Sequence, residues 1–167
     1  IVAFSGQAFL QCPLTLDYDA FRMSLEALDT NVIQRGGTNI SAAIEEAEIA
    51  FSSTSNRKII VLISDGEELE DSALEAAGKA AENGVVIYTL GVGGAGGEFI
   101  PVRDATGGTT LLKDESGNPV RSRLNEKTLT EIAEATGGFY EPLTADGMDT
   151  IYNEGLKKIP SQELSSR

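Results

Sequence analysis

The stretch Lys58-Ile-Ile-Val-Leu-Ile-Ser-Asp65 decides the fold of this chain. It is a run of five apolar, mostly β-branched residues that ends in a polar pair. A strand that is apolar on both faces is covered on both faces, so the pattern is typical of a central parallel strand with helices on either side. The stretch therefore predicts an α/β fold and places Asp65 at the carboxyl end of a central strand.

Outward from this strand, the sequence alternates between short β-rich runs and longer helical patterns. The run 85–90 repeats the buried-strand pattern. Further strands are expected at 1–4, 7–16 (an edge strand, interrupted by Pro13) and 139–140, and helices at 17–28, 39–51, 71–82, 124–136 and 148–159. The expected architecture is a Rossmann-like, open and mostly parallel sheet with helices on both faces. We expect 1–160 to form a single domain and 161–167 a polar tail.

Composition excludes several classes of function. The 167 residues include 26 acidic and 13 basic side chains, a net charge of -13, and no histidine. Ser-His-Asp and Cys-His nucleophilic sites and imidazole zinc sites are therefore excluded. The excess of carboxylates argues against a nucleic-acid partner, because phosphate binding needs a basic surface. The single Cys12 cannot form an internal disulfide and is interpreted as a small apolar side chain.

Two polar side chains fall where open parallel sheets bind ligands, at the carboxyl ends of strands. Asp65 closes the apolar strand, and Gly66 permits a sharp turn after it. Thr38 follows the break Gly36-Gly37 at the amino end of a helix, where its hydroxyl either caps the helix or faces a ligand. A hydroxyl and a carboxylate are hard oxygen ligands that suit magnesium. The structural alternative is an N-cap threonine and an ordinary strand-end aspartate, and spacing alone leaves both interpretations open.

The sequence around these two residues resembles a known family. Gly36-Gly37-Thr38-Asn39 and the stretch from Ile59 to Gly66 are similar to the von Willebrand factor A (vWA) family, whose metal-ion-dependent adhesion site (MIDAS) takes a threonine and an aspartate from these places. The closer resemblance is to the BatB-type bacterial aerotolerance subgroup. It is carried by 2–9, 11–17, 88–93, 112–114, 122–124 and 131–138.

This resemblance implies a non-enzymatic interaction module. Thr38 and Asp65 would hold a divalent cation, magnesium first, and a protein partner would supply an acidic side chain to the open coordination position. It also implies a bacterial protein anchored in the inner membrane through segments outside this sequence, with its soluble domain in the periplasm and operon partners that include a MoxR-type ATPase. The alternative function is a magnesium-dependent nucleotide- or phosphate-handling α/β enzyme that uses Asp65, which nucleotide binding by the pure protein would reveal.

One motif of the family is absent from the sequence. The Asp-x-Ser-x-Ser motif at the end of the family's first strand has no counterpart, because the sequence opens at what resembles the second strand. In the family's sheet the first strand lies between those resembling 1–4 and 58–65. We therefore expect these two strands to stay unpaired with each other, and an upstream strand-and-helix unit of ~30 or more residues or a neighbouring chain to fill the slot. With Thr38 and Asp65 alone, we expect the metal position to be empty or filled with water.

Other patterns favour structure over chemistry. The stretch 91–96 satisfies G-x-G-x-x-G, but such a fingerprint must open a helix and 97–101 is not helical, so a dinucleotide site is not favoured. An acidic cluster lacks the spacing of an EF-hand loop and is interpreted as a solvated loop and helix start. It comprises Glu67, Glu68, Glu70 and Asp71.

Two further expectations concern surfaces and packing. The segment 98–123 carries turn residues and few apolar anchors, so we expect it to project near the metal position and to bias the choice of partner.

Aromatic residues at core-like spacings are interpreted as packing. They include Phe21, Phe51, Tyr88 and Tyr152.

Overall fold

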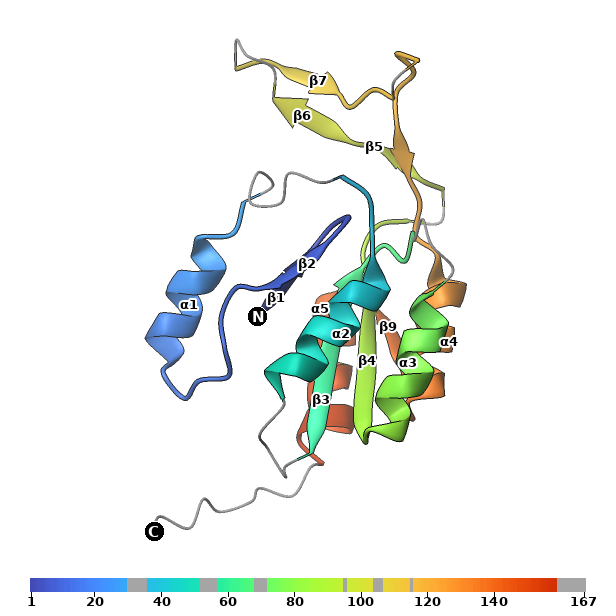
Figure 1. The fold of residues 1–167 in the computed structure, drawn as a ribbon. Helices are drawn as coiled ribbons and strands as arrows, with labels where there is room; N and C mark the ends of the chain where they lie inside the picture. The colour runs from blue at the N-terminus through green and yellow to red at the C-terminus, as the bar shows by residue number, and fades with distance from the viewer. Residues whose placement is uncertain are drawn as a thin grey trace.

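A parallel sheet of three strands organises the computed structural model, which describes residues 1–29, 36–51, 57–67, 72–94, 96–103, 107–114 and 116–158. The strands lie in the order β3-β4-β9 (Figure 1). β3 pairs with β4 over its whole length, from Lys58 opposite Val85 to Ser64 opposite Gly91. The predicted α/β class and the strand at 58–65 are confirmed, but among the described strands β4 is the middle one and β3 lies at the edge, so the expected central position of 58–65 is not met. The strand bounds are Lys58–Ser64 (β3), Val85–Gly91 (β4) and Tyr140–Pro142 (β9).

Helices lie on both faces of this sheet, as expected, although they leave part of β3 exposed. On one face α2 (Ile40–Ala50), α3 (Ala73–Glu82) and α4 (Glu126–Ala135) pack on β3 and β4. On the other face lie α5 (Ala145–Thr150) and a π-helical segment η1 (Ile151–Leu156) (Figure 1). The structure thus divides the helix expected at 148–159 into two segments and starts it earlier, because the Thr144 hydroxyl accepts a hydrogen bond from Gly147 N and caps α5 there.

The core lies between the sheet and the first helical layer. Its most deeply buried large side chains are Ile40, Ile44, Val85, Ile87, Leu129 and Ile132. Thr89 is also fully buried, and its hydroxyl donates to Leu129 O at 3.0 Å. Because a buried hydroxyl needs a partner, this bond fixes the position of α4 against β4.

The N-terminal part forms a hairpin beside α2, and a helix follows the hairpin (Figure 1). β1 (Val2–Phe4) and β2 (Ala8–Leu10) pair antiparallel, which confirms both expected strands, although the second is much shorter than 7–16. α1 (Tyr18–Glu26) starts where predicted, because the Asp17 carboxylate accepts hydrogen bonds from Asp19 N and Ala20 N. No helix in the described ranges is long and apolar enough to cross a membrane.

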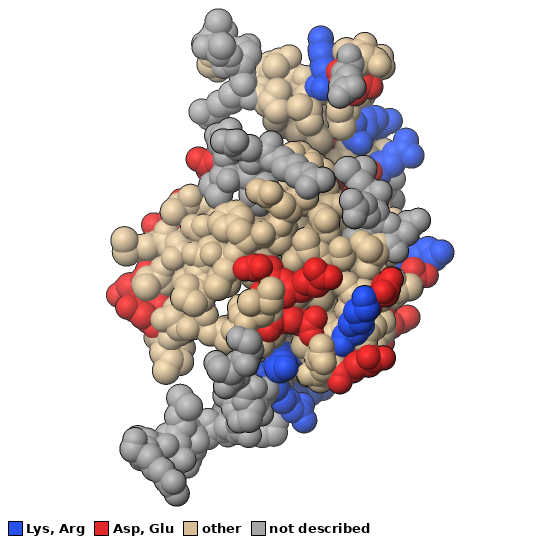
Figure 2. Space-filling model, in the orientation of Figure 1, with Lys and Arg blue, Asp and Glu red and all other residues tan. Residues whose placement is uncertain are grey.

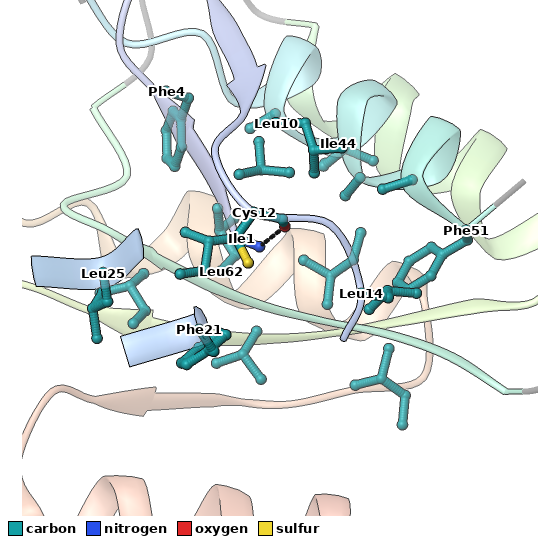
Figure 3. Close-up of a pocket in the computed structure, with 18 residues that line it drawn as sticks. Ile1, Phe4, Leu10, Cys12, Leu14, Phe21, Leu25, Ile44, Phe51 and Leu62 are labelled. Carbon is teal, nitrogen blue, oxygen red and sulfur yellow. Dashed lines mark hydrogen bonds between the residues drawn. The ribbon is translucent and has the colours of Figure 1, made fainter. Parts of the chain in front are cut away.

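An apolar groove separates the hairpin from the sheet. Within the described residues β1 pairs only with β2, and β3 only with β4, so the expectation that the first strand and 58–65 stay unpaired is confirmed. The groove between them has a volume of about 560 Å³ (Figure 3). Its lining is almost entirely apolar and comes from β1, β2, α1, α2 and β3, including Phe4, Leu10, Phe21, Leu25, Ile44 and Leu62. What fills the groove stays a prediction.

The groove corrects two expectations drawn from periodicity. β3 is not covered on both faces, because Val61 is 39% and Ile63 50% exposed. Phe21 is 43% exposed and Tyr152 56%, so these two aromatic residues are not core residues. The reason for β3 and Phe21 is the same: both line the groove, over which the described chain places no further element.

A β-arm projects from the sheet between β4 and α4 (Figure 1). This arm, the described part of 96–123, pairs β5 (Glu98–Phe99) with β8 (Arg121–Ser122) and β6 (Pro101–Arg103) with β7 (Thr109–Leu111), all antiparallel. The expected projection is confirmed. A strand, β5, follows the glycine-rich stretch, so the helix that a dinucleotide fingerprint requires is missing from this position.

The open edge of β3 generates a first prediction. Val61→Lys and Ile63→Lys should each reduce hydrophobic-dye binding and concentration-dependent self-association, because a free apolar edge recruits other chains. Fluorescence titration and sedimentation velocity measure both effects. Ile49→Lys is the matched control, since Ile49 is exposed on α2 but does not line the groove. Unchanged association of both groove variants would contradict this account.

A second prediction concerns Tyr140, the first residue of β9, which pairs with Thr89 of β4. Its hydroxyl is buried without a hydrogen-bond partner among the described residues. Burial, with the nearby Glu126 carboxylate, raises the pKa of Tyr140. Tyr140→Phe should therefore stabilise the fold by about 1 kcal/mol at neutral pH.

The same substitution should change the alkaline limb of stability. The folded state keeps the Tyr140 proton to higher pH than the unfolded state, so stability falls as pH rises from the ordinary tyrosine pKa through the raised one. Tyr140→Phe should lose this part of the decline, which urea unfolding at neutral and alkaline pH measures. A destabilised variant would show that the hydroxyl has a partner, and an unchanged alkaline decline would show that the pKa of Tyr140 is not raised in the folded state.

Candidate metal and interaction site

The two predicted ligands lie at the same edge of the sheet. Asp65 follows β3 directly, and Thr38 stands two residues before the first residue of α2. α2 begins at the end of the sheet where β3 finishes (Figure 1). The backbone around Thr38 is tied to the β1–β2 turn, because Ser5 Oγ donates to Gly37 O at 3.0 Å and Asn39 N donates to Ser5 O at 2.7 Å.

Asn39, not Thr38, caps α2. Its side-chain Oδ1 accepts hydrogen bonds from Ala42 N and from Ser41 Oγ, both at 2.8 Å. The interpretation of Thr38 as the helix cap is therefore wrong, for the physical reason that the next residue already satisfies the orphan helix N–H. Thr38 is half-buried, and its hydroxyl makes no hydrogen bond with any described residue. It is thus available to a ligand.

The Asp65 carboxylate is held in one orientation from two sides. Oδ1 accepts a hydrogen bond from Glu67 N at 3.1 Å, and Oδ2 accepts one from Ser122 Oγ at 2.6 Å. The backbone carbonyl of Asp65 also accepts from Asn125 N at 2.7 Å. Each carboxylate oxygen retains lone-pair capacity for a further contact. Both the following loop and the arm therefore fix where the Asp65 carboxylate points.

Gly66 makes the turn that the sequence predicts. Its φ is +72°, and a Cβ built there would lie 2.6 Å from Asn125 O and 2.9 Å from Leu129 Cγ. The absent side chain lets the loop after β3 lie directly on the start of α4. The closeness of this contact places Asp65 beside the segment that joins the arm to α4.

Three serines at this edge were not singled out by sequence reasoning. Ser72 Oγ donates to Ser41 Oγ at 2.9 Å and ties the start of α3 to the first turn of α2. Ser122 contacts Asp65, 57 positions away in sequence. Ser122 lies in one of the segments that carry the resemblance to the BatB-type subgroup, but a lone serine gives no signal of its partner.

The two proposed ligands have the donor atoms that a divalent cation prefers, but they supply only part of its coordination shell. The Thr38 hydroxyl and the Asp65 carboxylate are hard oxygen donors. No group of three or more Asp, Glu or Cys side chains comes together within the described ranges, and the sequence has no histidine. Since magnesium takes about six oxygens, most of the shell would be water, a partner's side chain or residues beyond those described.

The acidic cluster after Asp65 is only partly described. Glu67 accepts a hydrogen bond from Arg123 N at 2.9 Å through its Oε1, so it pairs with the root of the arm. Glu68, Glu70 and Asp71 lie outside the described residues. Figure 2 shows further acidic side chains over α2 and basic ones on the arm. The acidic side chains over α2 are Glu45, Glu46 and Glu48.

The chain is similar in sequence and in fold to known proteins. The family model for the von Willebrand factor type A domain matches residues 1–141. The crystal structure of a conserved hypothetical protein, BatB from Bacteroides thetaiotaomicron, has a TM-score of 0.86 at 36% identity and covers 93% of this chain and 76% of that one. An aerotolerance-related membrane protein from Bacteroides fragilis has a TM-score of 0.84 at 33% identity, covering 95% and 78%.

A more distant structure shares the fold alone. Proximal thread matrix protein 1 from the mussel byssus, described with a zinc-occupied MIDAS motif, has a TM-score of 0.62 at 19% identity and covers 93% of this chain and 33% of that one. No curated protein matches the sequence.

A matched pair of glycines tests how tightly the loop after β3 packs. Gly84→Ala should cost about 1 kcal/mol, because its φ of +76° strains any side chain although nothing lies within 4 Å. Gly66→Ala should cost at least about 1 kcal/mol more, because its Cβ also meets Asn125 and Leu129. Urea unfolding of both variants measures the difference. Equal losses would mean that the loop does not rest on α4.

Proposed function

Because the chain belongs to the von Willebrand factor type A domain family, we propose that it is a non-enzymatic module that binds a protein partner through a divalent cation held by Thr38 and Asp65. One observation carries the proposal: a Thr38 hydroxyl that bonds to none of the described residues and an oriented Asp65 carboxylate lie at one edge of the sheet, where α/β proteins bind ligands. Neither side chain belongs to the hydrophobic core, so both can be replaced without opening a cavity there.

The proposed roles follow from the environment of each side chain. Thr38 Oγ1 is a direct ligand, because Asn39 already caps α2. Asp65 binds directly or through a water, with its oxygens oriented by Glu67 N and Ser122 Oγ. A bound cation would offer an open coordination position to an acidic side chain of the partner. We propose magnesium, because all the donors are hard oxygens.

We also propose where the module works. One similar protein is an aerotolerance-related membrane protein, and the resemblance points to a bacterial protein anchored in the inner membrane through segments outside this sequence. Its domain would lie in the periplasm and act with operon partners that include a MoxR-type ATPase. A nucleic-acid partner is not proposed, since the net charge is -13.

The test compares ligand variants in partner capture. Thr38→Ala and Asp65→Ala should each lower magnesium-dependent capture of a membrane-extract protein about tenfold or more, because each removes a cation ligand, while circular dichroism stays unchanged. A chelator should lower capture by the parent protein to the same level. Asp149→Ala on α5, across the sheet, is the matched control and should capture as the parent does.

Two outcomes would contradict this function. Equal capture by the double variant and the parent would remove Thr38 and Asp65 from the interaction. Magnesium-dependent binding of a nucleotide by the pure protein, lost in Asp65→Ala, would favour the phosphate-handling enzyme instead.

A further inference from the structure

We infer that Ser122 is a positioning residue for Asp65, and that this contact couples the arm to the cation site. The inference rests on the proposed function and goes beyond it, because it assigns a role to a side chain of the arm that is not itself a proposed ligand. It begins from the hydrogen bond between Ser122 Oγ and Asp65 Oδ2, at 2.6 Å and half-buried. Hydrogen bonds to a charged acceptor are roughly twice as strong as neutral ones.

Ser122 reaches Asp65 from a rigid part of the arm. It lies in β8, which pairs with β5 through Glu98 opposite Ser122 and Phe99 opposite Arg121. The Arg121 guanidinium donates to Gly96 O and Gly97 O and lies 5.1 Å from the centre of the Phe99 ring. These contacts hold the two root strands together, so the hydroxyl of Ser122 is presented in a fixed place.

A second and a third contact tie the same root to the loop after β3. Arg123 N donates to Glu67 Oε1 at 2.9 Å, and Asn125 N donates to the Asp65 carbonyl at 2.7 Å. Leu124 N donates to Gly94 O at 3.3 Å, which joins the root to the end of β4. The residues 122–125 therefore run alongside the Asp65 loop. Among them, Ser122 contacts the carboxylate of Asp65, which is the group proposed to bind the metal.

Coupling follows from this arrangement. A residue that holds a metal ligand in its binding orientation raises the affinity of the site for the metal. Removing such a residue commonly lowers the metal affinity about 10–100-fold. By linkage, a cation that holds Asp65 in its bound orientation must favour the arm position that donates to it by the same factor. The position of the arm, which projects beyond the sheet, thereby depends on whether a cation is bound at the site.

The test measures hydrogen exchange in the arm and the affinity for magnesium in separate experiments. The amides of Ile100, Leu112 and Val120 (the root amides) are hydrogen-bonded within the arm next to β5 and β8. Their hydrogen exchange should speed up in Ser122→Ala and in Asp65→Ala to similar extents. The double variant should be no faster than either single one, because both remove the same bond. Ser122→Thr keeps the hydroxyl and should restore slow exchange. Ser116→Ala, at the far turn of the arm, is the matched control and should leave the root amides unchanged.

Magnesium titration by calorimetry gives the second readout. Magnesium should slow exchange of the root amides in the parent protein, and Ser122→Ala should lower magnesium affinity about 10–100-fold, with recovery in Ser122→Thr. A parent that binds magnesium with the same affinity as Ser122→Ala would overturn this inference while leaving the proposed function standing. A parent without any magnesium effect would overturn the proposed function, and the coupling with it.

Discussion

The in-register parallel pairing of β3 with β4 is the constraint on which the rest of this structure depends. Parallel strands end at one edge, so the residues that follow Ser64 and Gly91 emerge side by side. The loop at Asp65, the root of the arm and the start of α4 meet there for this reason. Backbone bonds such as Val92 N to Ser64 O and Asn125 N to Asp65 O then fix these segments to one another.

Much of the fold follows from local sequence. Apolar runs and capping residues predict β3, β4 and α1–α4 close to their observed bounds, because each of these patterns depends on a few neighbouring residues only. Periodicity does not tell whether an apolar face meets a neighbour, so the exposure of Ile63 and Phe21 could not be foreseen from it. The slot between the first strand and β3 was foreseen only through the resemblance to the vWA family.

The candidate site was predictable in part. Asp65 and Thr38 stand out because each is a polar residue at an element's end. The sequence does not decide whether Thr38 or Asn39 caps α2. The hydrogen bond from Ala42 N assigns the cap to Asn39. The contact of Ser122 with Asp65 joins positions far apart in sequence, and no local pattern reports it. Non-local contacts of this kind need the topology, which places the arm over the loop after β3.

The central claim is that Thr38 and Asp65 hold one divalent cation between them. The most direct measurement is anomalous diffraction from a crystal of the intact domain, with the slot beside β3 filled, after a soak in manganese, an oxygen-seeking substitute for magnesium. The account predicts an anomalous peak about 2.0–2.3 Å from Thr38 Oγ1, with an Asp65 oxygen or one water between Asp65 and the metal completing that side. Manganese bound elsewhere, with Thr38 and Asp65 free of it, would contradict the account.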